Sequence, residues 1–504
     1  MRYTLTLLAL LGLGASVRAD VVPAPLFTDN AVLQRDKPLP VWGTADTGEK
    51  VTVTFAGHSA TTTAGTDGKW RVDLPAQPAN ATPSDLVIKG NNTLTLANIV
   101  VGEVWIASGQ SNMEWSVNST FDKAIDIPAS AKSPLIRHIK IKRTIATAPA
   151  STVAIERTTW ESAGPATTGN FSAVGYYFAK DLHELLNVPV GIIGTNWGGT
   201  PVEAWISPDV LDANPAFAVV RERWAGNVAN YPQALEKFTA DLAAWESERD
   251  AAKAANTAFT KPAPKKPGDP AASPHQPTVL NNAMIAPLVP YALRGAIWYQ
   301  GESNAGRAKE YLALHSAMIT GWRTQFAQGD FPFYWVQLAN FASPTSTDWA
   351  FLREAQTQTL ALPNTGQAVI IDIGDVRDIH PRNKKDVGRR LARLALARDY
   401  GFKIIDSGPV MTKAERDGAG FRVTFNVAHS GLNAPLNDLS GFELAGEDKV
   451  FKPAQAKIEK DTVLVTSAEV PEPVAVRYAW RNAPVAGLFN KEGLPAVPFR
   501  SDTW

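Results

Sequence analysis

Ser111 has the sequence setting of a nucleophile. It follows an apolar, β-branched run at residues 100–107 and the turn residues Ser108 and Gly109, and it opens the segment Ser-Asn-Met. This order predicts a buried strand, a tight turn and a helix start, where a hydroxyl is exposed near backbone N–H groups able to hold an oxyanion. Because serine and asparagine after glycine are also ordinary turn and helix-capping residues, Ser111 is a candidate only.

His380 is the candidate base for Ser111. The chain has 7 histidines, and the others lie in expected helices, in β-textured segments or in a proline-rich linker. His380 follows an expected strand, in the loop Asp-Ile-His-Pro at 378–381. A lone histidine before proline is usually a turn residue, but at the same sheet edge as a serine it can take the hydroxyl proton.

Polar loops follow four expected strands. They are Gly-Gln-Ser-Asn at 109–112, Trp-Gly-Gly-Thr at 197–200, Gln-Gly-Glu-Ser-Asn at 300–304 and Asp-Ile-His-Pro at 378–381. Ligands of open α/β sheets bind outside the carboxyl ends of the strands, so we expect the loops to meet at one edge. Together they supply a hydroxyl, an imidazole, carboxylates and amides, which are the groups that acyl transfer requires.

The elements that position these loops alternate between strand and helix. Expected strands after residue 107 are 188–193, 293–299, 333–338 and 367–373. Expected helices are 171–186 with Ser172 as N-cap, 308–326, 352–362 and 385–400. This alternation predicts a mostly parallel sheet with helices on both faces.

The 504 residues are too many for one core and divide into several expected parts. Residues 20–99 and 404–504 have β texture, typical of small sandwich-like domains, and they flank the α/β region at 100–403. Residues 208–277 interrupt that region with an Ala/Glu/Lys-rich helical stretch and a proline-rich segment, KPAPKKPGDPAASPHQP. We interpret them as a surface insertion.

The N-terminus predicts export. Residues 1–19 combine the positive charge of Arg2, an apolar run at 4–14 and a small-residue cleavage site before Asp20, the parts of a signal peptide. Because the apolar run is too short to span a bilayer, we expect a periplasmic or extracellular protein without a membrane anchor.

Composition excludes several functional classes. Lys and Arg total 49 and Asp and Glu total 49, so the chain carries no electrostatic footprint for nucleic acid or an anionic membrane. The absence of cysteine excludes disulfides, thiolate zinc sites and a cysteine nucleophile. Without a His-Glu-x-x-His or similar ligand pattern, we expect neither a metal nor another cofactor.

Four motifs carry a resemblance to a known family. Gly-Gln-Ser-Asn-Met, Trp-Gly-Gly-Thr-Pro-Val-Glu-Ala-Trp, Trp-Tyr-Gln-Gly-Glu-Ser-Asn and Asp-Ile-Gly-Asp…Asp-Ile-His-Pro occur in this order within residues 100–396. As a set they closely resemble the sialate O-acetylesterase-like family of SGNH (GDSL-type) hydrolases, which is similar to acetylxylan esterases. The resemblance implies a flavodoxin-like, three-layer αβα core and a secreted serine esterase that removes O-acetyl groups from carbohydrates.

The resemblance also implies roles for individual residues. Ser111 would be the nucleophile and His380 the base. The oxyanion hole would combine the Ser111 N–H, an N–H of Gly198 or Gly199, and a side-chain amide. Many family members use asparagine for that amide; here Gln300 resembles its replacement, and Asn304 is the less favoured donor.

The sequence leaves open which carboxylate is the partner of His380. Family members usually carry aspartate three positions before the histidine, where this chain has Arg377. Asp378 is favoured, because two positions along an extended loop place both side chains on one side. Glu302 is the rival, since related esterases with a Gln-Gly-Glu motif can use that glutamate.

The sequence also leaves open which acetylated carbohydrate is the substrate. Trp115 and Trp197 are candidates for stacking on a sugar ring, although core packing is the commoner role of tryptophan. A hemicellulose such as xylan or xyloglucan, or pectin, is the alternative acetylated substrate. A non-catalytic carbohydrate-binding protein is the alternative of another class, which acetate release would distinguish. The sequence does not predict the oligomeric state.

Overall fold

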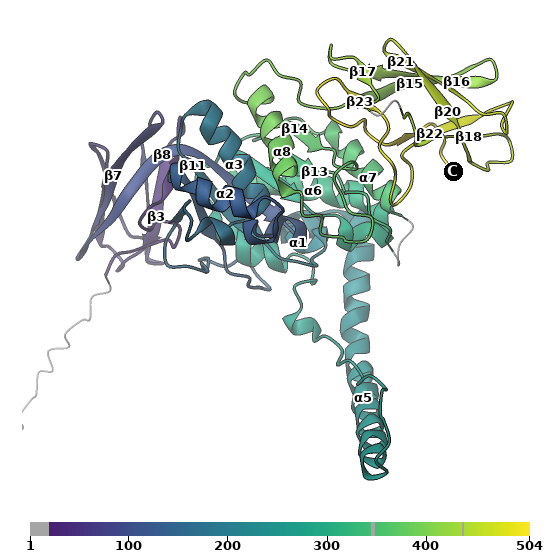
Figure 1. The fold of residues 1–504 in the computed structure, drawn as a ribbon. Helices are drawn as coiled ribbons and strands as arrows, with labels where there is room; N and C mark the ends of the chain where they lie inside the picture. The colour runs from purple at the N-terminus through teal and green to yellow at the C-terminus, as the bar shows by residue number, and fades with distance from the viewer. Residues whose placement is uncertain (1–19, 344–347, 436–437) are drawn as a thin grey trace, which may run out of the picture.

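The computed structural model describes residues 20–343, 348–435 and 438–504. The expected signal peptide lies outside these residues, so export stays a prediction. Figure 1 shows an α/β body with β structure at both ends and one helix that projects from it. No helix in the described ranges has the length and apolar composition needed to cross a membrane.

An 11-stranded sheet forms the centre of the molecule, and seven of its strands follow the path β10-β9-β11-β8-β12-β13-β14. The other four, β2, β4, β5 and β7, belong to the N-terminal β region described below. Neighbours from β9 to β14 pair in parallel, and β10 is antiparallel to β9. The strands are β8 (Thr93–Gly109), β9 (Ile136–Lys140), β10 (Glu161–Ser162), β11 (Val190–Asn196), β12 (Gly295–Tyr299), β13 (Phe333–Val336) and β14 (Thr365–Ala368).

The strand order places a ligand edge beside β8. From β11 to β14 the strands follow the order 2-1-3-4-5 of doubly wound flavodoxin-like sheets, with β9 added outside. The winding reverses between β8 and β12, and ligands of such sheets bind at that point, beyond the carboxyl ends of the strands. The expected α/β core is confirmed in part, because the strands from β9 to β14 are parallel while the 11-stranded sheet as a whole is mixed.

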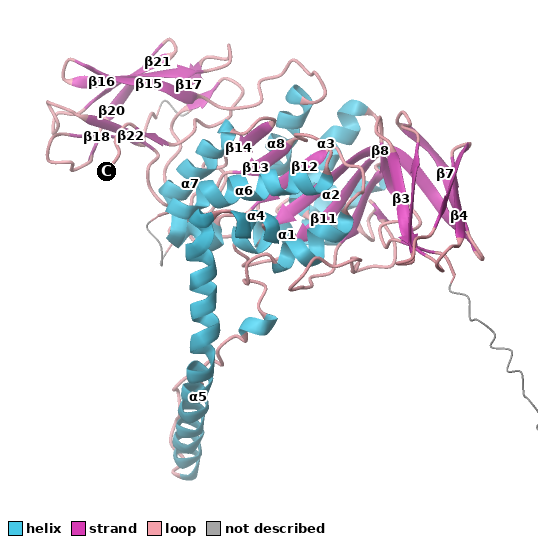
Figure 2. Ribbon diagram, turned by 180° about the vertical axis from the view of Figure 1, so that it is seen from behind, coloured by secondary structure: helices cyan, strands magenta, loops and turns pink. Residues whose placement is uncertain are grey.

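Helices cover both faces of this sheet (Figure 1 and Figure 2). Trp105 and Ala107 of β8 pack with α3 (Ala173–Leu186) and α8 (Lys384–Arg398). Successive strand residues point to opposite faces, so Val104 and Ile106 pack in the other core, with α6 (Ala308–Phe326) and α7 (Trp349–Gln358). Ser172 caps α3, accepting a hydrogen bond from the Gly175 N–H at 3.2 Å, as expected.

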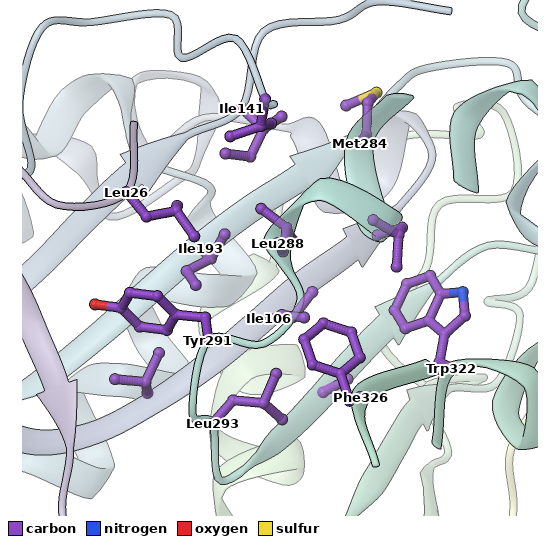
Figure 3. Packing of buried hydrophobic residues seen from close by; sticks show 14 of the residues in the cluster. Leu26, Ile106, Ile141, Ile193, Met284, Leu288, Tyr291, Leu293, Trp322 and Phe326 are labelled. Atoms are coloured by element: carbon purple, nitrogen blue, oxygen red, sulfur yellow. The ribbon is translucent and has the colours of Figure 1, made fainter. Parts of the chain in front are cut away.

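Figure 3 shows the core on the α6 face. Ile106 and Ile193 of the strands lie among Leu288, Leu293 and Phe326, all buried. Burial of such side chains contributes about 1.5–3 kcal/mol each, and here it fixes the sheet against α6.

The N-terminal β region is continuous with the core because β8 belongs to both. Its first half alternates in exposure and pairs with β7 (Asn80–Lys89), while its second half is buried throughout and pairs with β11 and β12. The strand therefore runs through residues 99 and 100, where the sequence suggested a division. The other strands are β1 (Val22–Pro23), β2 (Val32–Gln34), β3 (Leu39–Thr44), β4 (Lys50–Phe55), β5 (His58–Thr63) and β6 (Lys69–Leu74).

The C-terminal β region contains two four-stranded sheets around one apolar cluster. One is β15 (Val410–Asp417), β16 (Gly420–Asn426), β21 (Thr462–Thr466) and β20 (Gln455–Glu459); the other is β19 (Lys452–Pro453), β18 (Phe442–Ala445), β22 (Ala475–Tyr478) and β24 (Phe499–Arg500). A short pair, β17 (Leu432–Asn433) and β23 (Phe489–Asn490), accompanies them.

This cluster explains a difference from the expected strand at 367–373. β14 ends at Ala368, and the apolar residues Val369 and Ile371 beyond it pack into the C-terminal cluster. Their hydrophobicity reflects contact with the C-terminal β region rather than membership of the sheet.

The insertion forms a projecting arm. After the short α4 (Pro208–Ala213), α5 (Ala218–Ala254) extends away from the body, and the following chain returns beside it (Figure 1 and Figure 2). Trp245 holds the return, since its Nε1 donates to the carbonyl of Lys261 at 2.8 Å and its ring contacts Phe259 edge-on. Within α5, the buried residue is Val220, near the start of the helix.

Candidate active site

Ser111 stands at the reversal point of the sheet. β8 ends at Gly109, whose φ is +133°, and a Cβ built there would lie 2.1 Å from the Tyr299 carbonyl oxygen of β12. Glycine therefore permits β8 to pass this close to β12. The chain then turns into the short α1 (Ser111–Glu114), with Ser111 as its first residue.

The structure brings His380 onto Ser111. The His380 Nε2 lies 2.8 Å from the Ser111 Oγ, within hydrogen-bond range. The Trp115 ring stacks on the imidazole, with 5.0 Å between ring centroids and 14° between planes. Burial lowers the pKa of His380 below its usual value, and the positive charge of Lys384 lowers this pKa further. The Asp378 carboxylate partly offsets both effects by raising it. A neutral imidazole is the form that can accept the serine proton.

Asp378 approaches the other ring nitrogen. Its Oδ1 lies 3.9 Å from the His380 Nδ1, longer than a hydrogen bond, and accepts the His380 backbone N–H at 2.9 Å. The side chain is 53% exposed. Asp378 therefore shapes the histidine loop and is close enough to stabilise a charged imidazole.

Glu302 makes a different contact. Its Oε1 accepts a hydrogen bond from the Asn112 Nδ2 at 2.5 Å, and the same Nδ2 donates to the Ile379 carbonyl at 3.0 Å. The Glu302 Oε2 is buried without a hydrogen-bond partner in the described residues. Burial raises the pKa of Glu302, while the Asn112 bond and Lys384 counteract the rise. Glu302 thus reaches the loop of His380 through Asn112.

Lys384 completes this buried network. Its side chain is 0% exposed and donates to the Asn112 Oδ1. The ammonium lies 5.2 Å from the Tyr299 ring centroid and 5.9 Å from that of Trp115. Burial lowers the pKa of Lys384 to about 7, against the opposing effects of Glu302 and Asp378.

Sequence reasoning missed Asn112 and Lys384. A signal existed for Lys384: it shares one stripe of α8 with the buried residues Val387, Gly388 and Leu391. A lysine on the apolar stripe of a helix is a buried charge in need of partners.

Backbone donors surround the serine. Gly198 lies against it, since a Cβ built at Gly198 would be 3.3 Å from that of Ser111. The Gly198 N–H donates to the Glu114 Oε2 at 2.9 Å. Within the described ranges, the N–H groups of Ser111 and Gly199 have no acceptor. That of Ser111 belongs to the nucleophile itself and is free to hold an oxyanion.

The side-chain amides expected at the oxyanion hole are engaged elsewhere. Gln300 donates from Nε2 to the Thr200 carbonyl at 3.2 Å and to the Asn304 Oδ1 at 2.7 Å. Asn304 donates to the Glu203 Oε2 at 2.8 Å, and both amides are 0% exposed. In this conformation Gln300 has no amide hydrogen left for an oxyanion, and both residues brace the loops.

A cavity of about 450 Å³ opens at Ser111 and His380 and extends along β9 and β10, past His138 and Glu161. Trp115 borders this cavity but already stacks on His380. Trp197 has the Arg143 guanidinium 5.9 Å from its ring centroid. The described residues contain no group of three or more His, Asp or Glu side chains placed to hold a metal ion.

The pH profile tests the Lys384 charge. Because this charge opposes a second charge on His380, we expect Lys384→Met to raise the pKa of His380 and move the acid limb of kcat/KM up by about one pH unit. Lys385→Met is the matched control, since Lys385 pairs instead with Asp126 at 3.1 Å. An acid limb that stays in place in Lys384→Met would refute the electrostatic coupling.

Comparisons with known proteins agree on one family. A family model described as carbohydrate esterase, sialic acid-specific acetylesterase, matches residues 277–397, which include Glu302 and His380. The sialate O-acetylesterase of Rattus norvegicus is 29% identical over 94% of this chain and 93% of its own. That of Homo sapiens is 28% identical over 94% of this chain and 91% of its own.

A solved structure is also similar over nearly the whole chain. XAC1771, described as a novel carbohydrate acetylesterase from Xanthomonas citri, is 38% identical. The match has a TM-score of 0.82 and covers 96% of this chain and 100% of XAC1771.

Proposed function

Since the chain belongs to the sialate O-acetylesterase family of carbohydrate esterases, we propose that it removes O-acetyl groups by a serine mechanism through an acetyl-Ser111 intermediate. The observation that carries this mechanism is the 2.8 Å contact between the Ser111 Oγ and the His380 Nε2. The lowered pKa of His380 keeps the imidazole in its proton-accepting form.

Acylation follows from this geometry. His380 Nε2 takes the Ser111 proton while Oγ attacks the acetyl carbonyl carbon. The Ser111 N–H stabilises the negative oxygen of the tetrahedral intermediate. When the intermediate collapses, the bond to the sugar oxygen breaks and His380 returns the proton to that oxygen.

Deacylation repeats the steps with water. His380 takes a proton from a water molecule, whose oxygen attacks the acetyl carbon of acetyl-Ser111. Collapse releases acetic acid and returns the proton to Ser111. Asp378, near the His380 Nδ1, stabilises the charged imidazole formed in each half-reaction.

Acetate release from natural esters tests this function. We expect the wild-type enzyme to release acetate from at least one of O-acetylated sialic acid, xylan, xyloglucan and pectin, and Ser111→Ala to release none. Release by Ser111→Ala at the wild-type rate would refute the mechanism. Cleavage of a simple aryl acetate without release from any of the four would refute these carbohydrates as substrates.

A further inference from the structure

A second cavity, of about 150 Å³, lies at the base of the projecting arm. It is bordered by α5, by the segment after β11, by the 3₁₀ turn η9 (Glu302–Arg307) and by the returning chain of the insertion at His275 and Pro277. The other residues that line it include Gly199, Glu203, Arg223, Trp224, Asn227 and Arg307.

The position of this cavity connects it with Ser111. Gly199 follows Gly198, which packs against Ser111. Ser303, also at its wall, follows Glu302, and its N–H donates to Gln110, the residue before Ser111. The catalytic cavity and this arm-base cavity share no lining residue. Both cavities therefore border the segments that hold the nucleophile.

One stripe of α5 faces the arm-base cavity. Its lining includes Val220, Arg223, Trp224 and Asn227, with the spacing i, i+3, i+4 and i+7 of a single helix face. Farther along, α5 has no buried residue. The insertion thus presents one specific face to the active-site loops, at the end where it joins the body.

The chemistry of the lining suits an uncharged, hydroxyl-rich ring. Arg307 is paired with Glu203 at 2.8 Å, and Arg223 is paired with Glu310 at 2.6 Å. Both guanidinium groups therefore have carboxylate partners for their charge, but the Arg223 Nη1 and the Arg307 Nε are buried without a hydrogen-bond acceptor in the described residues. These two nitrogens can donate to the hydroxyl groups of a ligand. Trp224 adds an aromatic surface, which binds the apolar face of a ring.

The volume limits the occupant. Pockets for drug-sized ligands measure about 300–1,000 Å³, so the arm-base cavity has room for one small ring only. We propose that it is a glycosyl subsite, which binds an uncharged sugar residue adjacent to the acetylated one. The enzyme then prefers acetylated neutral oligosaccharides to acetylated monosaccharides and to acetylated sialic acid. This inference rests on the proposed function.

Trp224→Ala tests the subsite with three substrates. For the acetylated neutral oligosaccharide that the wild type cleaves best, we expect kcat/KM to fall about tenfold, through KM. For the acetylated monosaccharide of the same sugar and for an aryl acetate, kcat/KM should stay within about twofold. Trp245→Ala is the matched control, because this tryptophan of α5 does not line the cavity and packs against the returning chain and Arg249.

A second pair guards against a folding defect in Trp224→Ala. Asn227→Ala alters an exposed lining residue, and Asn230→Ala alters an exposed asparagine of α5 outside the cavity. We expect a smaller loss, confined to the oligosaccharide, from Asn227→Ala alone. Equal losses on all three substrates, no loss on the oligosaccharide, or wild-type preference for acetylated sialic acid would overturn the subsite. No acetate release from any carbohydrate would instead refute the proposed function.

Discussion

Replacing Ser111 with alanine is expected to lower kcat on an aryl acetate by about a millionfold, the scale of nucleophile removal from a serine triad. The hydroxyl oxygen is the atom that becomes acetylated, and in the described residues it makes a hydrogen bond to His380. Loss of this bond leaves the packing of α1 unchanged. Initial rates, with circular dichroism to verify the fold, measure the effect.

His380→Ala should cost about as much as Ser111→Ala, and the double variant little more, because the two side chains act as one unit. Ser116→Ala is the matched control, since Ser116 borders the same cavity. Mass spectrometry after rapid quenching should find the acetyl group on the peptide that contains Ser111. Near-native turnover in either single variant, or an additive double variant, would contradict the proposed pair.

The carboxylate partner of His380 gives the second large effect. We expect Asp378→Asn to lower kcat by about 100-fold, because the neutral amide no longer stabilises the imidazolium. This loss is smaller than the roughly 10⁴-fold cost of neutralising a buried triad aspartate. The reason is that the Asp378 carboxylate is half exposed and lies 3.9 Å from Nδ1. Single-turnover and steady-state rates would measure it.

Glu302 distinguishes a positioning role from a triad role. Glu302→Gln keeps an oxygen for the Asn112 Nδ2, so we expect kcat to stay within about tenfold of wild type. Glu302→Ala removes that acceptor, leaves the Asn112 amide, which also donates to the Ile379 carbonyl, less firmly held, and should lower kcat further. If Glu302→Gln lost orders of magnitude and Asp378→Asn did not, Glu302 would be the triad acid.

Local patterns were sufficient for the main elements. The apolar spacing of residues 308–326 predicted α6 with the observed bounds, and Ser172 was recognised as the cap of α3. The periodicity of helices and the buried runs of parallel strands are properties of adjacent residues. The juxtaposition of Ser111 and His380 also followed, because parallel strands bring the loops at their carboxyl ends to one edge.

Partners of buried polar groups were beyond such reasoning. Gln300 was expected to face an oxyanion, yet its amide is held by Thr200 and Asn304. Trp115 was expected at a sugar, yet it stacks on His380. Nothing in the neighbouring sequence determines which of several nearby acceptors a buried donor will use, since the choice depends on how loops from separate strands pack.

The sequence by itself determined the nucleophile and base candidates, the α/β alternation and the motif Gly-Gln-Ser-Asn that begins the site. The tertiary structure decided what supports them. Lys384 and Asn112 are separated by 272 positions along the chain and meet beneath the histidine loop. Their bond depends on α8 packing against α3, β13 and β14, a long-range arrangement that local spacing does not specify. Ser111 is thus identified by its own turn, whereas the groups that tune its histidine are identified only by the fold.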